Sequence, residues 1–379
     1  MYIQKLKLKN FRNYSDVEVL FNKNWNILIG NNGAGKTNIL EAIYYSATTR
    51  SPRTLKIENL IKNAESKFCV DIETNKNENI DTIRNLYFQN TENSGNLIKQ
   101  KQIKLNKKQI KLTDLLGKIP FVYFVPDDLY IIKGESSLRR KFLDFVLFQI
   151  YPNYKFLVKK YNELLKKRNY LLKEIKYNRS RIQYLDEWTQ LLVEAGIEIY
   201  KKRKELVEIF NSRLETGYKE IYFKDESLEI KYVSFLDEKS DKELFEFYYA
   251  ALKNNYEQEI RYGFTLIGPH RDDLQLIFNK QDVKKYGSQG QQRLYILTLK
   301  ILAADIIDYF LQEKPVLIFD DVFSELDMKN IARLINVLNE KYQVFVSAVD
   351  IDKIEQLFEK IAGENRLSVF RVKDGEIVL

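Results

Sequence analysis

Hydrophobic and polar residues alternate at the start of the chain, and short apolar runs return in its last third. Residues 2–8 alternate Tyr, Ile and Leu with Gln and Lys, and residues 25–29 (WNILI) lead into a glycine. A period of two indicates a half-buried strand, and a short apolar run indicates a buried one. The pattern predicts strands at these two places and at four more: 265–268, 274–278, 315–319 and 343–347.

Other segments predict helices and a hairpin. We expect helices from Asn38, at about 290–312 and at 329–340. Residues 65–112 predict strands and turns, and IKLNKKQIKL (103–112) predicts a hairpin with its turn at Asn106-Lys107. The hairpin lysines fit a DNA-binding surface or an edge strand kept soluble by charge, and we favour the edge strand.

The middle of the chain has a helical period, with almost no Gly or Pro from about 136 to 215. Apolar positions are spaced alternately by four and three on both sides of a polar break at 176–181. A short coiled-coil-like helix pair and a globular helical bundle would both give this pattern. The stripe comprises Leu157, Tyr161, Leu164, Arg168, Leu171 and Ile175, then Leu185, Trp188, Leu192, Ala195 and Ile199.

Strands and helices alternate at both ends of the chain, so the predicted fold class is α/β. We expect one α/β domain formed by residues 1–135 and 262–379, with a mainly helical domain inserted at 136–261. The length of 379 residues fits two domains.

Composition limits the classes of binding partner and the cellular compartment that fit this chain. The net charge of +8 fits an anionic partner such as nucleic acid, although solvated lysine faces would also produce it. The single cysteine, Cys69, excludes an internal disulfide, and with the single histidine, His270, it argues against a zinc site. No apolar run approaches about 18 residues, so we expect no membrane span. A reducing, cytoplasmic location follows.

A complete phosphate-loop motif, GNNGAGKT, lies between the strand at 25–29 and the following helix. Glycines let backbone amides approach phosphate oxygens, the lysine binds the β- and γ-phosphates, and the threonine hydroxyl ligates Mg²⁺. The candidate nucleotide-binding residues are therefore Gly30, Asn31, Asn32, Gly33, Ala34, Gly35, Lys36 and Thr37, with Lys36 also catalytic and Thr37 also a metal ligand.

An apolar strand, PVLIFDD (315–321), ends in two aspartates. A buried parallel strand would place Asp320 at the same sheet edge as the phosphate loop, where it completes the Mg²⁺ shell. Asp321 then polarises the attacking water as a general base. An acidic helix N-cap would look similar, but the phosphate loop favours the metal site.

A second glycine loop, YGSQGQQR (286–293), has no lysine. Ser288 is a helix cap, and the helix start that follows would bind an anion. An ordinary capped helix is the alternative.

The order of these motifs resembles that of the ABC-type ATPases, and more closely that of the RecF family of bacterial recombination-repair and replication proteins. The resemblance spans nearly the whole chain. It is carried by LKNFRNY (8–14), GNNGAGKTNILEAI (30–43), PDDLYIIKG followed by RRKFLD (126–144), GPHRDDL (268–274), YGSQGQQR and LIFDDVFSELD (317–327).

The resemblance implies an ATPase head with an inserted arm, binding ATP and Mg²⁺. It implies an ATP-dependent homodimer in which a signature motif of one subunit caps the ATP of the other. Arg12 matches an N-terminal arginine that contacts nucleotide. The signature residues in trans are Ser288, Gln289, Gly290 and Gln291, and the D-loop that crosses the interface contains Ser324 and Asp327.

Further implications concern the partners. The family resemblance implies binding to duplex DNA near single-strand gaps and a weak, DNA-stimulated ATPase that acts as a slow switch. It also implies the partners RecR, RecO and, indirectly, RecA. Two rival functions remain: the ATPase subunit of a membrane transporter and an SMC-type structural protein that bridges DNA. The helical insertion opposes the first, and the short arm opposes the second.

Some positions depart from the expected pattern. No glutamine stands at the Q-loop position, which leaves Asp127 or Asp128 as substitutes, and no switch histidine follows residues 343–347. His270 fits a packed, hydrogen-bonded residue or one that couples ATP to the arm. The two arginines of RRKFLD, Arg139 and Arg140, fit either DNA contacts or braces of an interface.

Overall fold

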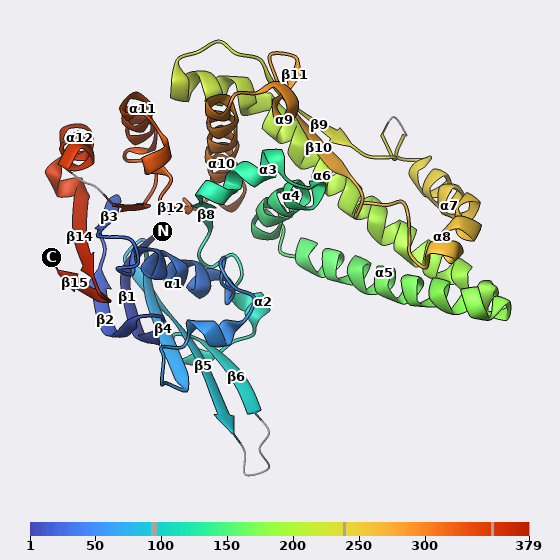
Figure 1. Ribbon diagram of the computed structural model, residues 1–379, viewed down its shortest axis with the longest axis horizontal. Coiled ribbons are helices and arrows are strands. Elements are labelled where there is room, and N and C mark those ends of the chain that lie inside the picture. The colour runs from blue at the N-terminus through green and yellow to red at the C-terminus, as the bar shows by residue number, and fades with distance from the viewer. Residues whose placement is uncertain (92–96, 238–239, 350–351, 379) are drawn as a thin grey trace. The chain divides into compact units, whose positions relative to one another are not determined.

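The computed structural model describes residues 1–91, 97–237, 240–349 and 352–378 (Figure 1). The chain forms two compact units. The first contains Met1–Asp128, Glu220–Phe223 and Lys300–Leu379, and the second contains Leu129–Lys219 and Lys224–Leu299.

A largely parallel sheet lies in the first unit, with the strand order β15-β14-β3-β13-β12-β8. Every residue of β3, β13, β12 and β8 is buried, as expected for strands of a parallel sheet that is covered on both faces. The predictions of strands at 25–29, 315–319 and 343–347 are confirmed to within a residue. The bounds are β3 Trp25–Ile29, β8 Phe121–Phe124, β12 Val316–Phe319, β13 Val344–Ala348, β14 Leu367–Lys373 and β15 Glu376–Val378.

An antiparallel sheet completes the strands of this unit, in the order β2-β1-β4-β5-β6-β7. The predicted hairpin turn is confirmed, because Asn106 and Lys107 have φ angles of 49° and 70° between β6 and β7. Strand β7 lies at the edge of this sheet, in agreement with the edge-strand interpretation of the lysine-rich hairpin. The bounds are β1 Tyr2–Phe11, β2 Tyr14–Leu20, β4 Lys67–Lys76, β5 Asn79–Thr91, β6 Leu97–Leu105 and β7 Lys108–Gln109.

Four α-helices lie wholly within the described part of the first unit: α1 Lys36–Thr48, α2 Leu112–Leu115, α11 Met328–Leu338 and α12 Asp352–Ala362. Helix α1 contacts β1, β4, β5 and β13, so it packs against strands of both sheets. It begins at Lys36, two residues before the predicted start. Helix α10, Gln289–Leu311, begins in the second unit and ends in the first.

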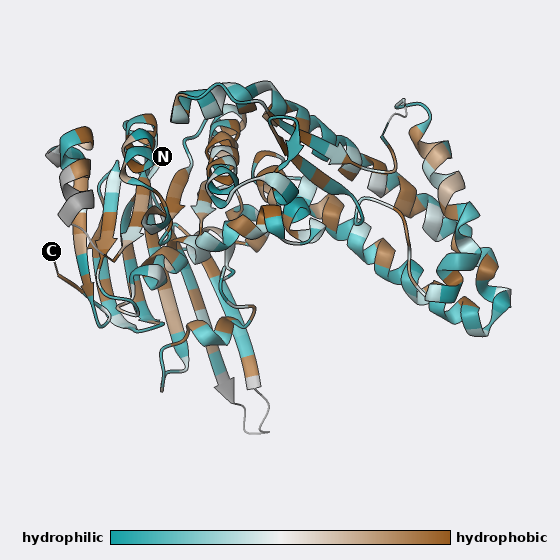
Figure 2. Cartoon of the chain, turned by 45° about the horizontal axis from the view of Figure 1, so that its top comes forward, coloured by the Kyte–Doolittle hydropathy of each residue, from teal (hydrophilic) through white to brown (hydrophobic). Residues whose placement is uncertain are grey.

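The second unit is mainly helical. Helix α6 returns from the turn after α5 in the opposite direction, and hydrophobic and hydrophilic residues alternate around both (Figures 1 and 2). Tyr161, Leu164, Arg168, Leu171 and Ile175 of the predicted stripe are all buried. The helices are α3 Tyr130–Lys133, α4 Ser136–Ile150, α5 Tyr154–Tyr177, α6 Leu185–Tyr222, α7 Leu244–Asn254, α8 Tyr256–Tyr262 and α9 Val283–Tyr286.

A small sheet, β11-β10-β9, belongs to the second unit. It comprises β9 Leu228–Val233, β10 Asp273–Phe278 and β11 Gln281–Asp282. Because β10 pairs with β9, residues 262–299 pack with the helices that precede them rather than with the first unit. The compact units therefore divide the chain differently from the domains 1–135 with 262–379 and 136–261, which stay a prediction about function.

The prediction of a strand at 265–268 is wrong. These residues form a loop. Side-chain oxygens, rather than the carbonyls of a neighbouring strand, accept hydrogen bonds from its backbone N–H groups. The backbone N–H of Thr265 donates to Asn169 Oδ1 at 2.8 Å, and that of Leu266 donates to Glu259 Oε1 at 2.8 Å. Short 3-10 helices complete the description: η1 Ile57–Leu60, η2 Pro126–Leu129, η3 Arg179–Tyr184, η4 Phe323–Glu325 and η5 Glu364–Arg366.

Candidate nucleotide site

The predicted phosphate loop connects β3 to α1 in the first unit. Gly35 has a φ of 124°, and a Cβ atom there would lie 2.7 Å from both Asn13 Nδ2 and Tyr14 Oη. A side chain at position 35 would therefore force Asn13 and Tyr14 to move, and it would also strain the backbone. The Lys36 ammonium donates to the carbonyls of Gly30 and Asn31 at 2.7 and 3.1 Å, so it lies across the mouth of its own loop.

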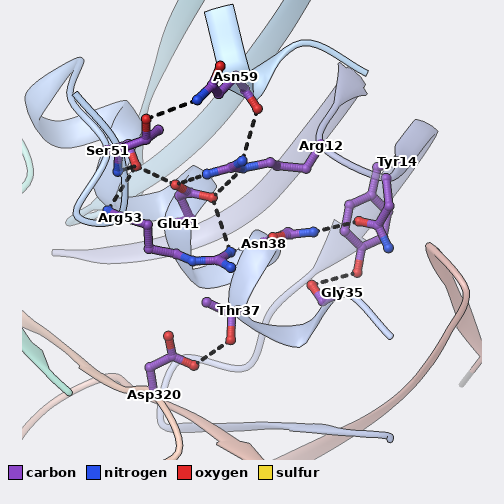
Figure 3. A network of polar contacts seen from close by, with 12 residues as sticks. Arg12, Tyr14, Gly35, Thr37, Asn38, Glu41, Ser51, Arg53, Asn59 and Asp320 are labelled. Carbon is purple, nitrogen blue, oxygen red and sulfur yellow. Dashed lines mark hydrogen bonds and ion pairs between the residues drawn. The ribbon is translucent and has the colours of Figure 1, made fainter. Parts of the chain in front are cut away.

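The N-terminal hairpin supports this loop from outside (Figure 3). Asn13 Nδ2 donates to the carbonyl of Ala34 at 3.0 Å. The Tyr14 hydroxyl donates to the carbonyl of Gly35 at 3.1 Å, as Figure 3 shows. Asn38 Nδ2 also donates to Asn13 Oδ1 at 2.8 Å. Sequence reasoning missed Asn13 and Tyr14 as loop supports, although both belong to the LKNFRNY motif.

The two predicted metal ligands come together. Asp320 follows β12, and its Oδ1 accepts a hydrogen bond from Thr37 Oγ1 at 2.9 Å (Figure 3). The Ser347 hydroxyl lies 2.8 Å from the same oxygen, and the Tyr123 hydroxyl donates to Asp320 Oδ2 at 2.8 Å. Asp320 is 6% exposed, so its charge is held by these donors rather than by water.

Asp321, the predicted general base, turns away from the strand with a φ of 55°. Its backbone N–H donates to Ser347 Oγ at 2.8 Å, and its Oδ1 lies 3.2 Å from the same oxygen. Burial and then the charge of Asp320 raise the pKa of Asp321, while Lys36 and Ser347 act in the opposite direction. A raised pKa makes this carboxylate a better proton acceptor.

A hollow of about 190 Å³ opens beside these groups. The guanidinium of Arg53 lies at its edge, and its Nη1 donates to Asn38 Oδ1 at 3.0 Å. Sequence reasoning did not single out Arg53, because no motif surrounds it. The lining residues are Asn32, Gly33, Gly35, Lys36, Thr37, Asn38, Arg53 and Asp321.

Arg12 forms an ion pair with Glu41 of α1. Its Nε and Nη2 donate to the two carboxylate oxygens at 2.8 Å each, and its Nη1 donates to the Asn59 carbonyl at 2.9 Å (Figure 3). The Glu41 side chain is fully buried, whereas that of Arg12 is 19% exposed. Arg12 thus connects the turn after β1 to α1, and its nucleotide contact stays a prediction.

The lysine-free loop lies in the second unit, between α9 and α10. Ser288 Oγ accepts from the Gln291 backbone N–H at 3.2 Å, and the Ser288 N–H donates to Gln291 Oε1 at 2.8 Å. This reciprocal pair is a capping box, so the predicted capped helix start is confirmed. Ser288, Gln289 and Gly290 are exposed.

The predicted D-loop residues make local contacts after β12. Ser324 Oγ donates to the Asp321 carbonyl at 2.7 Å, which fixes the turn that follows the two aspartates. Asp327 caps α11 by accepting from the Asn330 backbone N–H at 2.7 Å. Both residues are exposed.

In the second unit, His270 has the packed, hydrogen-bonded arrangement. Its Nε2 lies 3.2 Å from the Thr265 carbonyl, and its Nδ1 lies 2.7 Å from the Tyr161 hydroxyl. Arg139 is 5% exposed and pairs with Asp273, with Nε 2.6 Å from Oδ1. Arg140 donates to the Asp272 carbonyl at 2.5 Å. These contacts lie within the second unit, and both alternatives for the two arginines, DNA contacts and braces of an interface, stay predictions.

Comparisons with known proteins agree with this geometry. Residues 2–376 match the family described as RecF/RecN/SMC N terminal domain. The chain is 36% identical over its whole length to the DNA replication and repair protein RecF of Halothermothrix orenii, covering 98% of that protein. It is also 36% identical to that of Clostridium botulinum, with full coverage of both chains. The chain belongs to the RecF family.

Solved structures carry the same RecF-family fold. Two structures of the recombination mediator protein RecF in the RecFOR pathway, described as RecF-ATPrS and RecF-ATP, superpose with a TM-score of 0.86. They are 31% and 32% identical and cover 99% and 100% of this chain. An SMC head bound to part of ScpA, at 17% identity and a TM-score of 0.57, shares the fold. The fold is therefore the α/β ATPase head of this family, formed by both ends of the chain around a helical insertion.

Proposed function

We propose that this RecF-family protein is an ATP-driven switch that binds DNA during replication and repair. The observation that carries the proposal is the hydrogen bond of 2.9 Å between Thr37 and Asp320 beside the phosphate loop. It joins a hydroxyl and a carboxylate from segments far apart in the chain. Relatives described as RecF-ATP and RecF-ATPrS support ATP as the nucleotide.

The residues present fit ATP and Mg²⁺. Residues Gly30–Thr37 would bind the phosphates through backbone amides and the Lys36 ammonium. Thr37 and Asp320 offer the hard oxygen ligands that Mg²⁺ prefers. When bound, Mg²⁺ would neutralise charge that develops on the β- and γ-phosphate oxygens. Lys36 would exchange its two carbonyl contacts for the phosphates.

Hydrolysis needs a residue that orients water. We assign this role to Asp321, which lines the hollow and has a raised pKa. A water oxygen attacks the γ-phosphorus, the bond from phosphorus to the ADP oxygen breaks, and the water proton passes to Asp321. The short aspartate side chain fits the slow turnover of a switch better than rapid catalysis.

The second half of the site would come from another subunit. The first unit contains a complete phosphate loop with its own lysine, whereas the exposed start of α10 in the second unit offers backbone amides without a lysine. Ser288 and the amides near Gly290 would close on the γ-phosphate held by a second copy of the chain. ATP would then join two copies into a dimer with two bound nucleotides, and hydrolysis would release them.

DNA and protein partners follow from family membership and charge. The net charge of +8 fits binding through phosphate contacts, with little sequence preference. We propose duplex DNA near single-strand gaps as the site of action, with RecR, RecO and indirectly RecA as partners in the cytoplasm. The two RecF structures described as belonging to the RecFOR pathway support RecO and RecR as partners.

Among the helices that the structure describes, none is both long and apolar enough to cross a membrane. The rival function of an SMC-type bridging protein finds less support from the length of the arm. Helix α6, with 38 residues, is about 57 Å long at the usual rise per residue. That length suits a short arm rather than the long rod of an SMC-type bridging protein.

Fluorescence anisotropy with a labelled, gapped duplex tests this function. We expect the wild-type protein to bind more tightly with ATP and Mg²⁺ than with ADP, and the affinity to fall steeply with salt because phosphate contacts release counterions. The Lys36→Met protein should bind equally with either nucleotide. Equal DNA affinity of the wild type with ATP, ADP and no nucleotide would refute the switch.

A further inference from the structure

The hydroxyl of Tyr123 contacts the second oxygen of Asp320, and no motif of the chain includes this tyrosine. We propose that Tyr123 is a positioning residue of the metal site, which holds the Asp320 carboxylate so that Oδ1 faces the cation shared with Thr37. This inference rests on the proposed function, because it presumes that Asp320 ligates Mg²⁺ beside ATP.

The sheet places Tyr123 beside the aspartate. Strand β8 is parallel to β12, with Tyr123 opposite Ile318 and Phe124 opposite Phe319. The ladder continues one step further, since the Asp320 N–H donates to the Phe124 carbonyl at 2.9 Å. The Tyr123 side chain is buried, and its hydroxyl donates to Asp320 Oδ2 at 2.8 Å.

The donors to Asp320 divide between its two oxygens. Thr37 and Ser347 both approach Oδ1, at 2.9 and 2.8 Å, whereas Tyr123 approaches Oδ2. A cation bound by Oδ1 and the Thr37 oxygen would displace the bond between these two residues. The Tyr123 bond lies on the other oxygen and can persist. A hydroxyl bond to a carboxylate is among the stronger hydrogen bonds, so it restrains rotation of the carboxylate.

The backbone that carries Tyr123 is itself anchored. The Lys300 ammonium donates to the Tyr123 carbonyl at 2.5 Å and forms an ion pair with Asp128. Asp128 Oδ2 also accepts from the Val125 N–H at 2.7 Å. The Lys300 and Asp128 side chains are 8% and 14% exposed, so water competes little for these contacts.

The same contacts bear on the missing Q-loop glutamine. Asp128 is bound to Lys300 and to Val125, and Asp127 is exposed to solvent. Neither aspartate is directed to the metal ligands by any contact that the described residues make. Tyr123, three residues before Pro126, instead supplies the link between this segment and Asp320.

The test compares Tyr123→Phe with Tyr44→Phe. Tyr44 of α1 is the matched control, because its ring centroid lies 5.4 Å from that of Tyr123 and burial raises the pKa of its hydroxyl as well. Each protein is titrated with Mn²⁺ in the presence of ATP, and bound Mn²⁺ is measured by electron paramagnetic resonance. ATP binding in EDTA and thermal unfolding are measured alongside.

We expect Tyr123→Phe to weaken Mn²⁺ binding about tenfold or more, in the range usual for groups that orient metal ligands. Its ATP affinity in EDTA and the Mn²⁺ affinity of Tyr44→Phe should equal those of the wild type. A Tyr123→Phe protein with wild-type Mn²⁺ affinity would overturn the inference and leave the proposed function intact. So would a variant that fails to fold, because the hydroxyl would then serve folding rather than the metal.

The proposed function fails by a different result. If the wild-type protein binds no Mn²⁺ in an ATP-dependent manner, the metal site itself is wrong, whatever the tyrosine variant does.

Discussion

At the residue scale, His270 and Asp272 show how burial moves two neighbouring pKa values in opposite directions. Burial is the largest cause for both: it lowers the pKa of His270 to about 4 and raises that of Asp272 to about 6. The neutral imidazole suits its surroundings, because Nε2–H can donate to the Thr265 carbonyl while Nδ1 accepts from the Tyr161 hydroxyl.

The His270→Gln variant should therefore change the pH dependence of stability. Unfolded histidine binds a proton below its ordinary pKa of 6.5, whereas the folded protein resists protonation until about pH 4. Stability contributed by His270 is present above pH 6.5 and is lost as the pH falls toward 4. Because His270 is half-buried, we expect the wild type to lose about 1–2 kcal/mol relative to the variant over this range.

Urea unfolding at pH 4.5, 5.5 and 6.5 measures this difference. The contribution of Asp272 to stability changes with pH in the opposite direction. It favours the folded state at low pH and is lost as the pH rises from about 4 to about 6. The wild type should thus show the flatter profile, and the variant should become less stable as the pH rises. Parallel profiles for the two proteins would contradict the assignment.

Motif residues could be predicted from sequence, whereas their supporting residues could not. The phosphate loop and Asp320 each follow from the order of residues within a single short segment. Tyr123 and Ser347 contact Asp320 only because β8 and β13 flank β12, and the register of neighbouring strands cannot be read from spacing. Whether Asp321 is the base, and whether Arg12 contacts nucleotide, are still predictions.

At the element scale, Arg168 explains an irregularity in the helical stripe. Its side chain is fully buried, although it is a charged residue in a stripe that is otherwise hydrophobic. Its nitrogens donate to Thr189 of α6 at 3.0 Å, to Thr265 at 2.7 Å and to Glu259 of α8 at 2.6 Å. One arginine therefore connects α5 to two other helices and to the loop at 265–268.

Replacing Arg168 by Met should lower the free energy of unfolding by about 3–5 kcal/mol, because Glu259 is left buried without its partner. Urea unfolding measures the change. The matched control is Arg179→Met, whose partner Glu257 is 71% exposed, and its cost should stay below about 1 kcal/mol. Equal costs for the two variants would show that the buried pair does not stabilise the unit.

Apolar runs predicted most strands, and the failure at 265–268 has a local cause. The run TLIG has the composition of a strand, but Asn169 and Glu259 take its backbone N–H groups. Hydrogen bonds to side chains distant in sequence thus took the place of the strand pairing that the local pattern predicted. The helical stripes predicted buried faces correctly, because a helix keeps its period whichever neighbour covers it.

At the scale of the whole molecule, the α/β class and the helical insertion were predictable, and the borders of the compact units were not. Residues 262–299 belong with the helical unit because β10 pairs with β9, a contact that composition does not reveal. The phosphate loop lies in the first unit, and the capped, exposed start of α10 lies in the second.

The central claim is that ATP joins two copies of the chain, with Ser288 of one copy closing the nucleotide site of the other. Sedimentation velocity with ATP and Mg²⁺ tests it directly, using wild type, Lys36→Met, Ser288→Arg and Ser212→Arg. Ser212 is a matched control, being an exposed serine of α6 in the same unit as Ser288. Nucleotide binding of each protein is measured separately.

We predict that wild type and Ser212→Arg become dimers with ATP and stay monomers without it. Lys36→Met should stay monomeric because it fails to hold the phosphates. Ser288→Arg should bind ATP as tightly as the wild type, because the substitution lies outside the phosphate loop. It should still stay monomeric, because the arginine prevents the start of α10 from closing on the ATP of the other copy. A Ser288→Arg protein that dimerises with ATP as the wild type does would contradict the account.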